Sequence, residues 1–155
     1  MTISLSNLLG AGPAFSAYQG TNQSVSNTTA TLVNIDTVIF DTNSNFNTST
    51  KSFQPTVSGY YNISATISST FVSGDGGANI IYLYKNGSKY LTGSALAFSP
   101  DVMAAITCHA SSLIYMNGTT DYVQVYALFY STAPDNLIVS GASNSVFCGY
   151  LARQQ

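Results

Sequence analysis

The hydrophobic and polar residues of this chain alternate with a period of two along much of its length. Between residues 60 and 67 an apolar row alternates with a more polar one, and that apolar row is Tyr61, Ile63, Ala65 and Ile67. One row of such a strand faces the interior and the other faces water, as in an antiparallel sheet with one solvated side. No long segment has the three-to-four spacing of an amphipathic helix, and Lys, Arg, Gln and Glu, which favour helices, are scarce. The pattern predicts an all-β fold of about eight to ten short strands.

Two strand-like segments, residues 122–130 and 146–151, are apolar on both rows. A sandwich of two sheets has one interior, so a strand that is apolar on both rows needs a partner on its outer face. A neighbouring subunit is the simplest partner, and a packed loop is the alternative. The pattern does not say which row faces the core. The candidate interface residues are Tyr122, Tyr126, Phe129, Phe147 and Tyr150.

Two Asn-Gly pairs, Asn86-Gly87 and Asn117-Gly118, each follow a strand-like run. Both residue types tolerate positive φ, so we expect a tight turn at each pair. The glycine-rich segment Gly74–Gly77 is predicted to be a loop between strands.

The chain of 155 residues fits one domain that can bury a core without metals or disulfides. We divide it into an N-terminal arm, residues 1–12, and a head domain, residues 13–155. The arm ends in a Gly-Ala-Gly-Pro hinge. A loose apolar tail gains by being covered, so we expect it to dock on a partner's surface or to pack on its own head domain. The apolar residues of the arm are Ile3, Leu5, Leu8 and Leu9.

Charge is scarce, since only 6% of the residues are charged and the formal net charge is −2. Ser, Thr and Asn supply most of the polarity instead. Nucleic-acid binding needs clustered basic residues, whereas the four here are scattered along the chain, so we expect no nucleic-acid partner. The same scarcity excludes a basic patch for membrane surfaces, and no apolar run is long enough to span a bilayer. A weakly charged surface gives little colloidal repulsion, which favours burial in an oligomer or a larger assembly.

Few residues can carry out catalysis or bind metals. His109 is the sole histidine, and no Gly-x-Ser-x-Gly elbow accompanies it, so we expect no enzyme and no cofactor. Cys108 and Cys148 are either reduced and packed as apolar residues or bridged to each other. Together with His109 they cannot complete a structural zinc site within one chain. The eleven tyrosines are expected to pack in core and interfaces, and stacking on sugar rings is the alternative.

The spacing of certain apolar, acidic and glycine residues between Ile35 and Ala65 forms a signature. After Ile35 and Asp41, the signature continues through Phe46, Phe53, Gly59 and Tyr61. This spacing resembles that of the globular head of complement component 1q, a tumour necrosis factor-like jelly roll. The segments Pro13–Tyr18 and Ser145–Leu151 resemble the first and last strands of that family, and Asp121 stands at its usual acidic position.

The resemblance implies an antiparallel jelly-roll sandwich that forms homotrimers, with Phe46, Phe53, Gly59 and Tyr61 as motif residues of its core. Some complement-type heads bind calcium near the trimer apex, and Asp75 and Asp101 are the weak candidate ligands here; solvated loop acids are the favoured interpretation.

Heads that resemble this one occur in secreted proteins, on bacterial surfaces and in virus particles. We expect a virion protein without catalytic activity, a decoration or cement protein that bridges capsid subunits of a phage or other virus. The chain starts with its own Met and shows no signal peptide or collagen stalk, which favours this context. The alternative is an extracellular or fibre-tip adhesin that recognises a host glycan or protein through the loops at 74–77 and 98–101.

Overall fold

The computed structural model describes residues 12–70, 76–99, 105–131 and 136–155. These residues form thirteen strands and no helix, which confirms the predicted all-β class. No helix within the described ranges is long and apolar enough to cross a membrane. The strands are β1 (Ala14–Tyr18), β2 (Gln23–Val25), β3 (Thr31–Leu32), β4 (Thr37–Asp41), β5 (Phe46–Asn47), β6 (Ser52–Phe53), β7 (Gly59–Thr70), β8 (Gly77–Lys85), β9 (Ser88–Phe98), β10 (Ala105–Met116), β11 (Val123–Ser131), β12 (Asn136–Ile138) and β13 (Val146–Gln154).

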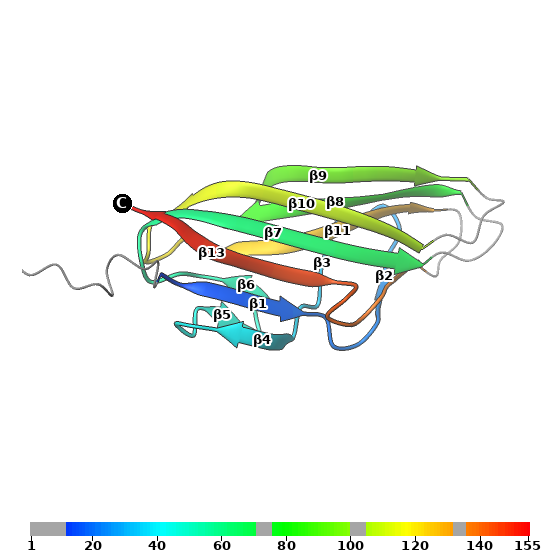
Figure 1. The fold of residues 1–155 in the computed structure, drawn as a ribbon. Helices are drawn as coiled ribbons and strands as arrows, with labels where there is room; N and C mark the ends of the chain where they lie inside the picture. Colours follow the sequence, from blue (N-terminus) through cyan, green and yellow to red (C-terminus); the bar gives the residue numbers. More distant parts are fainter. Residues whose placement is uncertain (1–11, 71–75, 100–104, 132–135) are drawn as a thin grey trace, which may run out of the picture.

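The strands form two antiparallel sheets that pack face to face as a sandwich (Figure 1). Sheet A contains β10, β7, β13, β1 and β4 in spatial order, and β12 and β2 continue it beyond one end of β13. Sheet B runs β9, β8, β11, β6 and β5, with β3 also paired to β11. The first and last strands, β1 and β13, are neighbours, with Phe15 opposite Gly149. Two antiparallel sheets that bury alternate residues between them form a β-sandwich, and the architecture here is that of a jelly roll.

The interior lies between the sheets and is lined by one row from each long strand. On β7 this row is the predicted one, and Tyr61, Ile63 and Ile67 have no exposed surface. On β11 the inward row runs from Val123 to Phe129, both without exposed surface. The alternation in sequence therefore marks the inner row of β7 correctly, whereas on β11 the structure decides between two largely apolar rows.

An aromatic cluster fills the end of the core beneath β1. The Phe15 ring stacks on Phe53 with centroids 4.2 Å apart and on Phe46 at 5.3 Å. Phe147 meets the Phe15 ring edge to face, with centroids 4.9 Å apart. Tyr61 meets the Phe53 ring in the same way, with centroids 5.6 Å apart. The motif aromatics Phe46, Phe53 and Tyr61 thus belong to one cluster centred on Phe15 of β1.

The motif glycine Gly59 is needed for close approach of two strands. It lies opposite Gln154 at the start of β7, and a Cβ at this position would lie 2.4 Å from the Arg153 carbonyl oxygen. Because that atom belongs to the backbone of β13, it cannot swing aside. A side chain at position 59 would therefore separate β7 from β13.

The two Asn-Gly pairs differ in structure. Asn86 and Gly87, with φ values of 53° and 76°, form the two-residue turn between β8 and β9, as predicted. Asn117 and Gly118 instead begin a longer connection from β10 in sheet A to β11 in sheet B. A turn does begin at this pair, where Gly118 has a φ of 74°, but it does not close a hairpin, because β10 pairs with β7 and not with the strand that follows it.

Candidate binding surfaces

The predicted interface residues do not form one surface. Phe129 and Phe147 have no exposed surface and belong to the core of the protomer, so neither can contact a neighbouring subunit, and their assignment to the interface is corrected. Tyr122 and Tyr126 lie on the outer side of sheet B, and Tyr150 lies on the outer side of sheet A. The doubly apolar pattern arose because each strand has one row in the core and an outer row that includes tyrosine and other apolar residues.

The outer side of sheet A presents large apolar side chains at one end, on the three adjacent strands β10, β7 and β13. Register places Leu113 and Tyr150 on either side of Asn62, whose amide donates to the Tyr150 hydroxyl at 3.2 Å. In the next row Tyr115 is opposite Tyr60, with ring centroids 5.5 Å apart. Leu113 is 57% exposed and Tyr150 52%. We call Tyr60, Asn62, Leu113, Tyr115 and Tyr150 the sheet A face.

The outer side of sheet B carries five tyrosines on β8 and around β11. The Tyr84 and Tyr126 rings stack with centroids 4.1 Å apart, and Tyr82 lies opposite Tyr126 in the register. The ammonium of Lys89 lies 5.1 Å from the Tyr82 ring centroid, a cation–π distance. Burial raises the pKa of Tyr82 and Tyr126, and neighbouring tyrosines raise it further. The tyrosine platform comprises Tyr82, Tyr84, Tyr122, Tyr126 and Tyr130.

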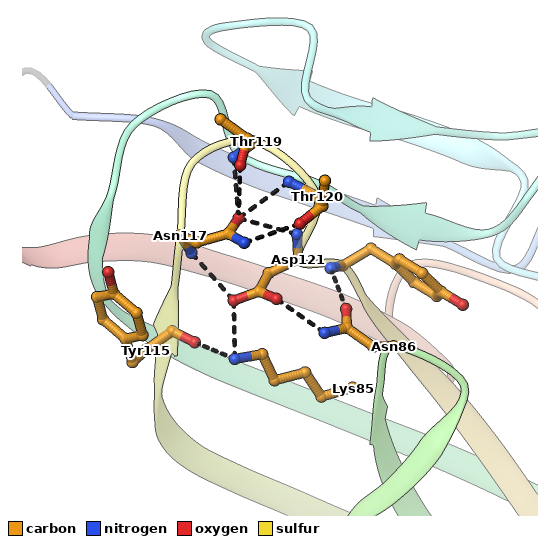
Figure 2. A network of polar contacts seen from close by, with 8 residues as sticks. Lys85, Asn86, Tyr115, Asn117, Thr119, Thr120 and Asp121 are labelled. Carbon is orange, nitrogen blue, oxygen red and sulfur yellow. Dashed lines mark hydrogen bonds and ion pairs between the residues drawn. The ribbon is translucent and has the colours of Figure 1, made fainter.

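Asp121 is the centre of a polar network that joins the two sheets near the β8–β9 turn (Figure 2). Its carboxylate accepts from the Asn86 amide at 2.7 Å and from the Asn117 backbone N–H at 3.0 Å, and it pairs with Lys85 at 2.8 Å. Lys85 also donates to the Tyr115 carbonyl oxygen at 2.7 Å. The network thus connects β8 and the start of β11 in sheet B to the end of β10 in sheet A.

Asn117 and Asn86 hold the backbone on either side of that carboxylate. The Asn117 side-chain oxygen accepts from the backbone N–H groups of Thr119, Thr120 and Asp121, each at about 3 Å, and shapes the connection. Burial raises the pKa of the Asp121 carboxyl. Hydrogen bonds from Lys85, Asn86 and Asn117 and the charge of Lys85 outweigh this effect, so the pKa lies below its ordinary value. The network therefore has a structural role and holds an ionised carboxylate that has little exposure to water.

The cysteines lie on opposite sides of sheet A and cannot reach each other. Cys108 is fully buried in the core, where its thiol donates to the Asn79 carbonyl oxygen at 3.4 Å, whereas Cys148 is half-buried on the outer side beside Ser64. Both are free thiols, which resolves the two alternatives left by the sequence. Burial raises the pKa of Cys108 to about 11 and also raises that of Cys148, so neither thiol is activated as a nucleophile.

His109 is exposed on β10, with its Nδ1 3.3 Å from the Thr66 hydroxyl. Within the described residues no group of His, Cys, Asp or Glu could hold a metal ion. The calcium candidates Asp75 and Asp101, the apolar arm residues Ile3, Leu5, Leu8 and Leu9, and half of the positions of the two candidate recognition loops lie outside the described residues.

No protein-family model and no curated protein matches the sequence. Solved structures do match. The globular domain of zebrafish complement 1qA superposes with a TM-score of 0.61 at 17% identity, covering 93% of this chain and 99% of that one. Murine APRIL at pH 5.0 gives a TM-score of 0.63 at 9% identity, over 89% of this chain and 97% of its own. The fold is the complement 1q and tumour necrosis factor-like jelly roll.

A third solved structure matches over a similar share of both chains. Eiger, a tumour necrosis factor from S. frugiperda, superposes with a TM-score of 0.60 at 12% identity over 92% of this chain and 95% of its own. All three matches span nearly the whole of both chains, so the described sandwich corresponds to a complete head domain of this type. At these identities the likeness concerns the fold and not the ligand or activity.

Proposed function

We propose that this protein is a homotrimer without catalytic activity that acts by presenting binding surfaces. The observation that carries the proposal is the sheet A face, where Leu113 and Tyr150 lie on either side of Asn62 and each exposes more than half of its surface. A contiguous exposed apolar area is typical of a protein–protein contact. A trimer of identical chains would cover it with three equivalent contacts.

The absence of an assembled catalytic group within the described residues supports a binding role. The one histidine contacts a threonine, both thiols have raised pKa values, and the buried carboxylate is neutralised by Lys85. None of these arrangements activates a nucleophile or a general base.

For the biological setting we propose a virus particle, in which the trimer decorates the capsid and bridges shell proteins through the arm, residues 1–12. A surface rich in Ser, Thr and Asn with only 6% charged residues supports a protein that works within an assembly. Three arms on one trimer raise avidity, because each further arm binds intramolecularly after the first has docked. An adhesin or receptor-binding head at a cell surface is the competing role.

Two measurements test this proposal. Light scattering on the full chain and on residues 13–155 should give the mass of three chains in both cases, and a single-chain mass in both would refute the trimer. Antibodies against the head should label virus particles purified from the biological source of the sequence. Removal of residues 1–12 should abolish rebinding to stripped particles, and rebinding by the shortened protein would refute the role of the arm.

A further inference from the structure

A polar groove lies on the outer side of sheet B, beside the tyrosine platform. Its volume is about 270 Å³, just below the roughly 300–1,000 Å³ of sites for drug-sized ligands. It is partly open to solvent, and no charged residue lines it. The lining residues are Asn47, Thr50, Ser52, Gln54, Tyr122 and Gln124.

Strand register builds this groove. Ser52 of β6 is opposite Asn47 of β5 on one side and opposite Gln124 of β11 on the other. Gln124 is in turn opposite Tyr84, so the same row continues into the tyrosine platform. Ser52 is only 6% exposed, whereas Asn47 and Gln124 on either side of it are more exposed. A single row of the sheet thus joins amide groups, a hydroxyl and an aromatic ring.

Hydrogen bonds fix the orientation of the amides. Gln124 donates through Nε2 to the Thr50 carbonyl oxygen, and Gln54 donates through Nε2 to the Thr119 carbonyl oxygen, each at 2.8 Å. The side-chain oxygen of each glutamine then has no hydrogen bond to the described residues and remains an acceptor. The Asn47 side-chain oxygen is held by the backbone N–H groups of residues 49 and 50, which leaves its amide nitrogen as a donor.

We propose that this groove binds a neutral saccharide, with roughly one or two sugar rings in contact. Sugar hydroxyls both donate and accept, which matches fixed amide acceptors, an amide donor and the Thr50 and Ser52 hydroxyls, which bond each other at 2.7 Å and keep one donor hydrogen between them. The apolar C–H face of a pyranose packs on an aromatic ring, and Tyr122 supplies one within the groove. The Tyr122 backbone is bonded in both directions to Asn86, which holds this strand in place before a ligand arrives.

The lining also predicts selectivity. A sialylated or sulfated sugar would bury an anionic group among side chains that offer no cation, so neutral oligosaccharides should be preferred. The groove is built within one protomer and does not depend on the proposed trimer. If the trimer forms, three grooves raise the avidity for a multivalent glycan surface.

The test uses the full chain on an array of oligosaccharides with terminal glucose, galactose, mannose or N-acetylglucosamine, together with sialylated and sulfated forms. We expect binding to neutral members. For the best neutral oligosaccharide, calorimetry should show at least a tenfold loss of affinity for Tyr122→Ala and for Gln124→Ala. Tyr90→Ala is the matched control, because Tyr90 is 49% exposed on β9, which is separated from β11 by β8, and it should bind normally.

Three results would contradict the proposal. The protein could bind no neutral oligosaccharide, it could bind only acidic ones, or both groove variants could keep the affinity of the unaltered protein. Near-ultraviolet circular dichroism checks that the variants fold. If a variant does not fold, amide chemical shifts of the unaltered protein decide instead. Addition of the neutral oligosaccharide should shift the resonances of residues 47–54 and 122–124, and shifts located only elsewhere would overturn the assignment.

Discussion

The outer faces of the two sheets hold their aromatic residues in different ways. On sheet B, Tyr84 and Tyr126 stack on each other within one protomer, and Lys89 covers Tyr82. On the sheet A face, Tyr60 and Tyr115 contact each other, but Tyr150 and Leu113 are separated by Asn62 and remain more than half exposed. Aromatic rings that stack within the protomer already gain from packing, whereas exposed ones gain only when a partner covers them. We therefore propose that the outer side of sheet B stabilises the protomer and holds the ligand groove, and that the sheet A face serves self-association.

Loss of the Asp121 carboxylate should have the largest effect on both faces, because its network fixes the sheets relative to each other. Asp121→Ala leaves the Lys85 ammonium, the Asn86 amide and the Asn117 N–H without their acceptor, at a cost of about 2–3 kcal/mol in the free energy of unfolding. Urea denaturation at pH 7 measures this cost. Asp121→Asn, which keeps the shape but not the charge, should lose less.

The same network predicts a specific dependence on acid. The pKa of Asp121 in the folded protein lies below the ordinary 3.8, so the carboxylate contributes its full stability above that value. This contribution is lost as the pH falls through the folded-state pKa. The stability difference between the wild-type protein and Asp121→Ala should therefore shrink below about pH 4. A difference that stays constant down to pH 2 would show that the charge does not matter.

Two tyrosine variants should separate stability from association. Tyr126→Ser removes a stacked, half-buried ring and should lower the free energy of unfolding by about 1–2 kcal/mol while the oligomer persists. Tyr150→Ser removes an exposed ring and should weaken the oligomer, with little change in the stability of the separated protomer. Urea denaturation and light scattering at several protein concentrations measure the two quantities. The account would fail if Tyr126→Ser dissociated the oligomer and Tyr150→Ser did not.

The smallest expected effect is a change in the labelling rate of one thiol, Cys148. Cys148 lies on the outer side of sheet A, one row beyond Tyr150, while Cys108 is in the core. If subunits cover that side, Cys148 should react slowly with a disulfide reagent in the oligomer and several-fold faster in Tyr150→Ser. Cys108 should react only when the protein unfolds, which provides an internal control. Equal Cys148 rates in both proteins would place the contact elsewhere.

The fold could be predicted from the sequence because its determinants are local. Alternation marked the inner row of β7, and the motif residues Phe53 and Gly59 lie in the core and against β13. The Asn86-Gly87 turn was predictable for the same reason, since two adjacent residues determine it. At Asn117 the same dipeptide opens a crossover between sheets, and only strand pairing distinguishes the two cases.

The surfaces could not be predicted because they depend on register between distant strands. The sequence does not show that Tyr84 covers Tyr126, so the outer row of β11 looked as if it needed a subunit. Phe147 was misassigned because both rows of its strand contain aromatic residues and nothing in the sequence says which is inside. The groove joins Asn47, Ser52 and Gln124 from three strands, and such residue types are too common in this chain to be noticed alone.

The most direct test of the account is sedimentation equilibrium on two matched leucine variants. Leu113 is 57% exposed on the sheet A face, and Leu96 is 42% exposed on β9 at the edge of sheet B. Leu113→Asp would bury an unpaired carboxylate in the proposed contact, so it should sediment as a folded single chain, while Leu96→Asp should keep the mass of three chains. The opposite result, a trimer for Leu113→Asp and a single chain for Leu96→Asp, or trimers for both, would contradict the assignment of self-association to sheet A.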